Sequence, residues 1–212
     1  YDDAVSNEAG KYWIDGVQQS LPLELNGSRS HGLFVSGSDV YIPGVFMTPI
    51  KWRATYWKNG SEVYLTDGTY RAEAAAIVVS GSDVYVAGNE RNAADNNVAK
   101  YWKNETAVNL TDGSKNARAR SIFVSGADVY VSGEDGAIAK YWKNGTAVNL
   151  TDGSKDADAH SIFVVGSDVY VAGYEGNGAY IGVAKYWKNG VAFNLTDGSK
   201  DASAYSIFVS GS

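Results

Sequence analysis

One segment of the sequence, 40 to 45 residues long, recurs five times along the chain. Its clearest marker is a Tyr-Trp pair, and successive pairs are separated by 44, 45, 40 and 45 residues. The pairs are Tyr12-Trp13, Tyr56-Trp57, Tyr101-Trp102, Tyr141-Trp142 and Tyr186-Trp187. A second marker, similar to SIFVSG, keeps the same spacing and starts at Gly32, Ala76, Ser121, Ser161 and Ser206. A repeat of this length predicts one supersecondary unit that is built five times, each unit packing against its neighbours.

Each repeat is predicted to hold four short strands. In one copy the apolar run SIFVSG (121–126) is typical of a buried strand, and DVYVSG (128–133) follows after a short turn. The segments AKYWKNG (139–145) and AVNLTDG (147–153) come next, and the Asn-Gly between them favours a two-residue hairpin turn. A polar segment then leads into the next SIFV-like strand, so the pattern predicts a four-stranded antiparallel sheet in each repeat.

Four antiparallel strands in 40 to 45 residues is the period of a β-propeller blade. An open solenoid of small sheets is the rival arrangement, but a closed ring is favoured because it removes exposed sheet edges. The sequence therefore predicts an all-β fold, a single five-bladed β-propeller domain over residues 1–212. We expect the C-terminal inner strand, residues 206–212, to close the ring by pairing with the N-terminal strands in a shared last blade.

The YWKNG phrase at 141–145 and the SIFVVGSDVYVAG phrase at 161–173 resemble those of bacterial repeat proteins of unassigned function. The resemblance covers essentially the whole chain and implies a fold similar to five-bladed propellers, which include lectins and glycoside hydrolases. The chain lacks the WD and kelch signatures, and it lacks the S-x-D-x-G-x-x-W phrase of sialidases. Because one fold hosts many functions, the resemblance leaves the activity open.

Composition excludes several classes of protein. The formal net charge is -6, with 18 Lys and Arg against 24 Asp and Glu, which argues against a nucleic-acid partner. The absence of cysteine excludes disulfides and thiolate metal sites. No apolar run reaches the roughly 20 residues of a transmembrane helix, so we expect no membrane insertion. Seven Asn-x-Ser/Thr sites, several of them inside predicted strands, favour a bacterial source. We expect an extracellular or cell-surface location, as a monomer or as part of a larger chain.

The copies differ mainly in two sets of connections, which a propeller places on the same face. The segments between the second and third strands are residues 43–54, 89–97, 134–138 and 174–182. The segments before the first strands end at His31, Ala75, Arg120, His160 and Tyr205. The turns on the opposite face, SGSD and KNG, are nearly constant. Exposed loop positions drift freely in many proteins, but binding sites are also often built from loops on a rigid scaffold.

Aromatic and charged residues of this variable face predict a ligand-binding surface. Exposed aromatics beside polar side chains suit sugars or protein partners. The candidate contacts are Trp52, Phe46, Arg53, Tyr174, Tyr180, His31, Arg120, His160 and Tyr205. The chain is therefore predicted to be a non-catalytic binding module for a glycan or a protein. The repeated Tyr-Trp pair is assigned to packing, one ring toward each adjacent blade, because strand neighbours point to opposite faces.

Two alternatives remain open. The chain could be a structural repeat domain of a larger surface protein with no ligand of its own, or a glycan-active enzyme. A glycosidase needs two carboxylates beside one bond, and the predicted inner strands, SIFVSG and its copies, carry no acid. No GxSxG, Walker or HExxH phrase occurs, so we expect no catalysis and no cofactor. Asp156, Asp158 and Asp201 are a weak candidate set for Ca²⁺, against the alternative that they are solvated acids.

Overall fold

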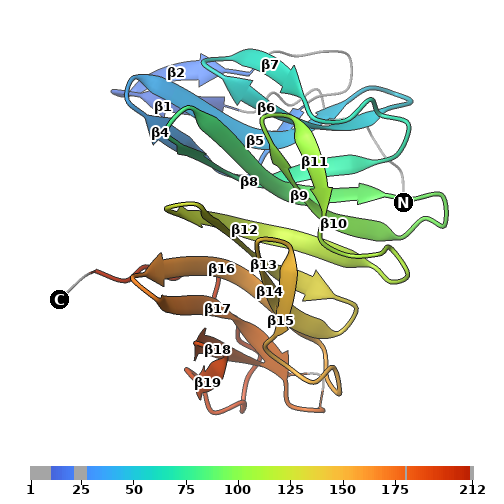
Figure 1. The fold of residues 1–212 in the computed structure, drawn as a ribbon, viewed down its shortest axis with the longest axis vertical. Coiled ribbons are helices and arrows are strands. Elements are labelled where there is room, and N and C mark those ends of the chain that lie inside the picture. Colours follow the sequence, from blue (N-terminus) through green and yellow to red (C-terminus); the bar gives the residue numbers. More distant parts are fainter. Residues whose placement is uncertain (1–10, 22–27, 180, 211–212) are drawn as a thin grey trace.

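The computed structural model describes residues 11–21, 28–179 and 181–210, and this part of the chain contains strands and no helix. Nineteen strands form five antiparallel sheets, which we name sheets A to E in chain order. Figure 1 shows the sheets following one another from β1–β2 at the top to β16–β19 at the bottom. The all-β class and the four-stranded repeating unit predicted from the sequence are confirmed, giving a propeller-like series of sheets. The described residues hold no helix long and apolar enough to cross a membrane.

Three sheets repeat the same simple order, with each strand pairing to the next. Sheet C contains β8 (Ala72–Ser80), β9 (Asp83–Arg91), β10 (Asn97–Lys103) and β11 (Thr106–Asn109). Sheet D contains β12 (Ala117–Ser125), β13 (Asp128–Asp135), β14 (Ile138–Lys143) and β15 (Thr146–Asn149). Sheet E contains β16 (Ala157–Val165), β17 (Asp168–Gly176), β18 (Gly182–Lys188) and β19 (Val191–Asn194).

The first two sheets differ from this order. In sheet B the inner strand is divided into β3 (Ser28–Ser30) and β4 (Phe34–Ser36), which both pair with β5 (Asp39–Met47). The sheet continues with β6 (Trp52–Lys58) and β7 (Ser61–Tyr64). Sheet A is the hairpin of β1 (Lys11–Ile14) and β2 (Val17–Ser20).

The inner strands of sheets C, D and E begin earlier than the sequence predicted and contain a bulge. The predicted start of the inner strand in sheet D was Ser121, whereas β12 already pairs at Ala117 and shifts register between Ala119 and Ser121. A Cβ on Gly133 of β13 would overlap the carbonyl oxygen of Arg118, so only glycine fits opposite this part of the strand. The bulge leaves one residue unpaired in each of these strands: Ala75, Arg120 and His160.

The two nearly constant turns are constant because they bind each other. In sheet D the Asn144 side chain donates to Asp128 Oδ1 at 2.7 Å and accepts from the Val129 backbone N–H at 2.9 Å. Lys143 Nζ lies 2.8 Å from Asp128 Oδ2 and 5.3 Å from the centre of the Tyr130 ring. These hydrogen bonds, first from Lys143 and then from Asn144, hold the pKa of Asp128 below its usual value. We call this group the turn clamp.

The same turn clamp joins the two turns of sheets B, C and E. Its Asp, Lys and Asn members there are Asp39, Lys58 and Asn59; Asp83, Lys103 and Asn104; and Asp168, Lys188 and Asn189. The Asn adopts a positive φ in each copy, as the predicted Asn-containing hairpin turn requires. In sheet A the equivalent positions are Ile14 and Asp15, so this hairpin lacks the Lys and the Asn of the clamp.

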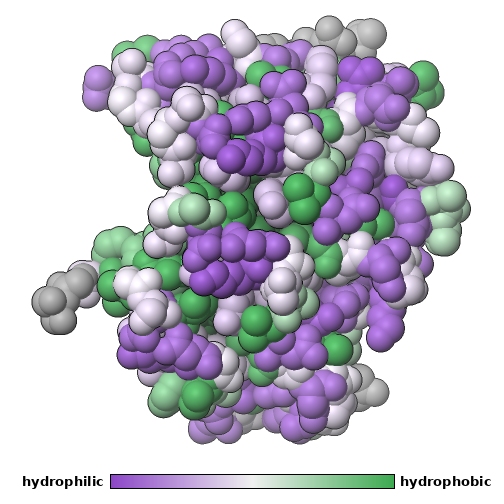
Figure 2. Space-filling view, viewed as in Figure 1, coloured by the Kyte–Doolittle hydropathy of each residue, from purple (hydrophilic) through white to green (hydrophobic). Residues whose placement is uncertain are grey.

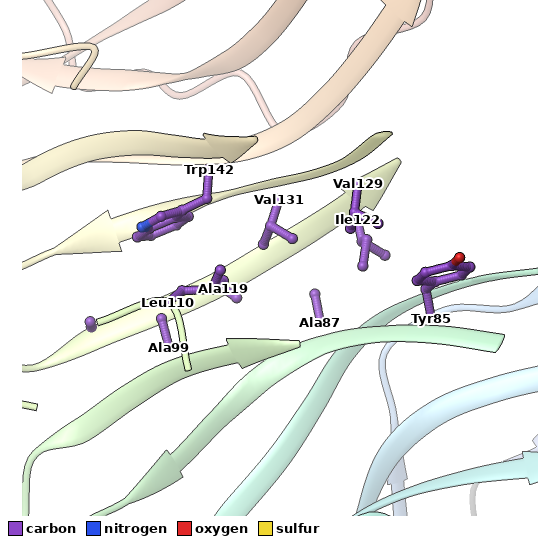
Figure 3. Packing of buried hydrophobic residues seen from close by; sticks show 10 residues of the cluster. Tyr85, Ala87, Ala99, Leu110, Ala119, Ile122, Val129, Val131 and Trp142 are labelled. Carbon is purple, nitrogen blue, oxygen red and sulfur yellow. The ribbon is translucent and has the colours of Figure 1, made fainter. Parts of the chain in front are cut away.

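The core of the molecule lies between neighbouring sheets. Trp142 of β14 is 1% exposed and packs toward sheet C, in one cluster with Ala99 and Leu110 (Figure 3). Tyr141, the next residue in the strand, packs against the cluster between sheets D and E. In sheets B, C and D the prediction that the Tyr-Trp pair serves packing, with one ring on each side of the sheet, is confirmed. In sheet A, Trp13 is 60% exposed.

The predicted ring closure is not present among the described residues. The hairpin of sheet A packs against sheet B through Tyr12 and Leu21, and β1 and β2 pair only with each other. The C-terminal segment, residues 201–210, lies beside β16 at the other end of the series: Ile207 N–H donates to Ser161 Oγ at 3.3 Å. The ring of Phe208 lies 5.0 Å from Phe163. This segment therefore lies beside β16, the inner strand of sheet E, and it forms no strand with sheet A (Figure 1).

Candidate ligand-binding pocket

A pocket of about 750 Å³ lies on the variable face, where sheets D and E meet the C-terminal segment. Its walls include the bulge residues of β12 and β16, the connection after β17, and residues 201–205. Four of the candidate contacts predicted from the sequence line it: Arg120, His160, Tyr174 and Tyr205. They come from three different repeats, so the fold brings together positions that are up to 85 residues apart in the sequence.

Arg120 joins sheet D to sheet E at the floor of the pocket. Its Nη2 and Nε lie 2.7 and 3.0 Å from Asp158 Oδ2 in β16. Nη2 also lies 3.4 Å from Glu134 Oε1 in β13. The Asp158 side chain is 3% exposed, and a charge this deeply buried requires a partner. The bulge at Arg120 therefore directs a cation toward Asp158 of the neighbouring sheet, and the same guanidinium also contacts Glu134 of its own sheet.

The sequence prediction that the inner strands carry no acid is wrong, because those strands begin four residues earlier than expected. Asp158 lies in β16, and Glu73 lies at the equivalent position in β8. Glu134 stands close by in β13, and its burial, together with the charge of Asp158, raises its pKa. Alternating small residues at 157 and 159 were the signal for an extended strand in which every second residue faces packing.

Three aromatic rings form a stack along one wall. The His160 ring lies 5.0 Å from the Tyr205 ring at an interplanar angle of 20°, and 5.8 Å from the Tyr174 ring. Burial lowers the pKa of His160, which favours the neutral imidazole, and burial also raises the pKa of Tyr174. Tyr205 is 74% exposed. The stack therefore offers an uncharged aromatic surface that ends in an accessible ring.

The pocket exists because one variable connection is short. In sheet C the longer loop after β9 covers the neighbouring turn: Asn92 and Asn96 donate to the carbonyl of Gly113 at 2.9 and 3.1 Å. In sheet E, Asn177 makes the same bond to Gly198 at 3.0 Å. The connection in sheet D is only 134–138, and no side chain of it bonds the equivalent Gly153 in the described structure. Gly153 lines the pocket instead.

The candidate contacts His31, Trp52 and Arg53 lie outside this pocket. His31 Nε2 donates to Glu73 Oε1 at 3.0 Å, and Nδ1 donates to the Ala74 carbonyl at 3.0 Å. The pKa of His31 is raised, mainly by the hydrogen bond with Glu73. Trp52 begins β6, and the guanidinium of Arg71 lies 3.7 Å from its ring centre. The guanidinium of Arg53 lies 4.7 Å from the ring centre of Tyr64. Tyr180 lies outside the described residues.

Phe46 was predicted to be an exposed aromatic contact, and this is wrong. Its side chain is 2% exposed and belongs to the cluster between sheets A and B, with Trp57 and Ile42. Phe46 lies inside β5, which extends to Met47, so the strand continues through residues that the sequence assigned to a loop. The strand pairing turns this ring toward the core.

The weak Ca²⁺ candidate set does not form a cation site. Asp158 Oδ2 is bound to Arg120, and Asp201 Oδ1 accepts from the Gly182 backbone N–H at 2.8 Å. Asn116 holds the position equivalent to Asp201 in an earlier repeat, and it accepts a hydrogen bond from the Asn97 N–H in the same way. We therefore assign Asp201 the structural role of binding the preceding loop. Across the described residues no group of three or more His, Cys, Asp or Glu side chains is placed to hold a metal ion.

No protein-family model matches the chain, and no curated protein matches it.

Proposed function

We propose that this protein is a non-catalytic binding module that uses its variable face to hold a glycan or a protein partner. The observation that carries the proposal is the convergence of Arg120, His160, Tyr174 and Tyr205 in one pocket. Clefts of about 300 to 1,000 Å³ with aromatic walls and a few polar groups are the usual form of ligand sites. The turn clamp and the packed interfaces between sheets supply the rigid scaffold that such a site needs.

A glycan is the ligand class that we favour, because the exposed ring of Tyr205 stands beside polar side chains. The test combines a glycan array with a pull-down of protein partners, using the intact chain and the variants Tyr205→Ala and Tyr174→Ala. Tyr70→Ala is the matched control, because Tyr70 is also an exposed tyrosine of a variable segment but lies outside the pocket. We expect both pocket variants to weaken binding at least tenfold and the control to leave it unchanged. Equal binding by all four proteins would refute the proposal.

An enzyme remains the second alternative, because Glu134 and Asp158 stand near one another. Both carboxylates, however, are bound by Arg120, so neither is free to approach a glycosidic oxygen in this arrangement. We therefore assign the two acids to binding Arg120. Release of reducing sugar from a glycan that binds the pocket, lost in Glu134→Gln, would favour the enzyme instead.

For the arrangement of the sheets, we propose a closed five-bladed propeller in which sheet A and the C-terminal segment form the fifth blade. Its support is the pair of uncovered end faces: Trp13 and Leu195 are 60% and 56% exposed, although their equivalents in other repeats are buried. A structural repeat domain in a larger surface protein, with another repeat covering each face, is the alternative. Cysteines at these two positions, in a chain that has none, should be joined by a short bifunctional reagent within one molecule. Joining only between molecules, or not at all, would favour the alternative.

We also propose an extracellular or cell-surface location and a bacterial source. The seven Asn-x-Ser/Thr sites, several of them inside predicted strands, support the bacterial source.

A further inference from the structure

The charges around the pocket narrow the class of ligand. Two basic side chains, Arg120 and Lys155, and three acidic ones, Asp156, Asp158 and Asp201, line it. Arg120 is already paired with Asp158 and with Glu134, which stands behind it. Lys155 is the remaining cation, and Asp156 follows it directly in the chain. The lining therefore carries more negative than positive charge.

An acidic ligand would meet this excess of negative charge with only Lys155, which stands next to Asp156 in the chain, to receive it. Sites that recognise carboxylate, sulfate or phosphate groups use unoccupied guanidinium or ammonium groups, in most cases with bidentate geometry. Here Nε and Nη2 of Arg120 both already contact Asp158. Displacing Asp158 would leave a 3% exposed carboxylate without its partner, which is strongly unfavourable.

The aromatic wall offers a different kind of contact. Tyr205 stacks on His160 and is 74% exposed, so its ring is accessible to a ligand. The C–H groups of a pyranose ring pack on such a surface, and the hydroxyl groups around the ring pair with polar side chains. Asp156 is exposed and can accept hydrogen bonds from these hydroxyls, while Lys155 can donate to them.

We propose that the pocket is a subsite for a neutral saccharide, with Tyr205 as the stacking surface and Asp156 as the residue that rejects acidic saccharides. This inference rests on the proposed function, since it names the ligand class of the same pocket. Asp156 is distinguished from its counterparts Asn116 and Asp201, whose side chains bind a backbone N–H of the preceding loop. Asp156 lines the pocket, and no hydrogen bond of this kind is formed by its side chain in the described structure, where the connection of sheet D is short.

The experiment measures binding of matched neutral and acidic oligosaccharides by calorimetry at low and at physiological salt. The probes are neutral gluco-, manno- and galacto-oligosaccharides, the corresponding uronate oligomers, and glucosamine oligomers. We expect at least one neutral series to bind at least tenfold more tightly than its uronate counterpart, and Tyr205→Ala to abolish that binding. Asp156→Lys should reduce the ratio of the affinities for the neutral and the uronate series by about tenfold at low salt, and Asp156→Asn should reduce this ratio by a smaller factor.

The outcomes separate the two proposals. Tighter binding of a uronate or of a glucosamine oligomer than of every neutral series overturns the inference and leaves the pocket as a binding site. A protein partner lost in Tyr205→Ala, with no saccharide bound, also overturns the inference but supports the proposed function. If Asp156→Lys keeps the same preference for neutral over acidic saccharides and unfolds thermally like the intact chain, Asp156 is not the residue that rejects acidic saccharides. Binding of saccharides that is indifferent to every pocket variant refutes both proposals.

Discussion

The interfaces inside the series of sheets and the two faces at its ends contain the same residue types in different surroundings. Trp57, Trp102, Trp142 and Trp187 are at most 1% exposed, whereas Trp13 at the equivalent position is 60% exposed. Leu65, Leu110 and Leu150 are 9% exposed, whereas Leu195 is 56% exposed. Figure 2 shows hydrophobic residues gathered near the base of the projecting C-terminal segment. The repeat thus encodes a two-sided interface, and burial depends on the presence of the next sheet.

The contrast has an energetic consequence for the whole chain. Each internal interface removes a tryptophan and several aliphatic side chains from water, which stabilises the two sheets by several kcal/mol. The end faces present the same groups to solvent, and exposed apolar surface of this kind marks a site of association. An end face is therefore the place where closure within the chain, or contact with another repeat, yields the most additional stability.

The largest expected effect is at an internal interface. Trp142→Ala should reduce the free energy of unfolding by about 3 to 5 kcal/mol, because a fully buried indole is replaced by a cavity. Chemical denaturation monitored by far-UV circular dichroism measures the loss. Trp187→Ala, at the next interface, is the matched comparison and should cost a similar amount. A loss below about 1 kcal/mol in both would show that the internal interfaces are not the source of stability.

The next prediction concerns the end face. If sheet A closes the ring as we propose, Trp13→Ala should cost about 2 kcal/mol or more, although Trp13 is exposed in the described arrangement. A double-mutant cycle with Leu195→Ala should give a coupling energy of about 0.5 kcal/mol or more, since the two residues would share one interface. A cost within about 0.5 kcal/mol for Trp13→Ala, as for ordinary surface positions, would mean that the face stays open.

The different origins of these contacts explain what the sequence could and could not predict. The strands, the hairpin turns and the packing role of the Tyr-Trp pair depend on contacts within one repeat or between identical repeats, so one pattern predicts all copies. The pocket depends on unlike repeats: Arg120 meets Asp158 of the next sheet, and the exposure of Gly153 to the pocket depends on the length of 134–138. The sequence did show that this connection is short, because Tyr101 and Tyr141 are separated by 40 residues whereas the other Tyr-Trp pairs are separated by 44 or 45.

The start of the inner strand was missed for a related reason. A bulge separates residues 117–119 from the SIFV-like run in sheet D, and it interrupts the apolar pattern by which the strand was recognised. The polar side chains placed there, Arg118 and Arg120, resemble loop residues in the sequence. Arg118 pairs with Glu134 across the strands of its own sheet, whereas the pairing of Arg120 with Asp158 becomes visible only when sheets D and E are next to one another.

The turn clamp is complete in sheets B to E and incomplete in sheet A, which gives a third comparison. Asn144→Ala should cost about 1 to 2 kcal/mol, because it removes hydrogen bonds to Asp128 and Val129 and places alanine at φ 50°. Asp15→Ala, at the equivalent turn of sheet A, should cost less, because Ile14 replaces the clamp lysine there. Thermal unfolding of the two variants measures the difference. Equal costs would show that the positive φ alone, and not the clamp, determines the effect.

The smallest expected effect distinguishes the two histidines, which occupy equivalent positions of sheets B and E but have different neighbours. The hydrogen bond with Glu73 raises the pKa of His31, so its contribution to stability is complete below pH 6.5 and is lost as the pH rises through the raised value. Burial lowers the pKa of His160, so stability falls as the pH drops from 6.5 through the lowered value, where a buried imidazole must become charged. His31→Asn should therefore destabilise the protein more at pH 6 than at pH 8, and His160→Asn should flatten the loss of stability between pH 6.5 and 5. Denaturant midpoints measured from pH 5 to 8 test both slopes, and slopes of the same sign in the two variants would contradict the assignment of a charged His31 and a neutral His160.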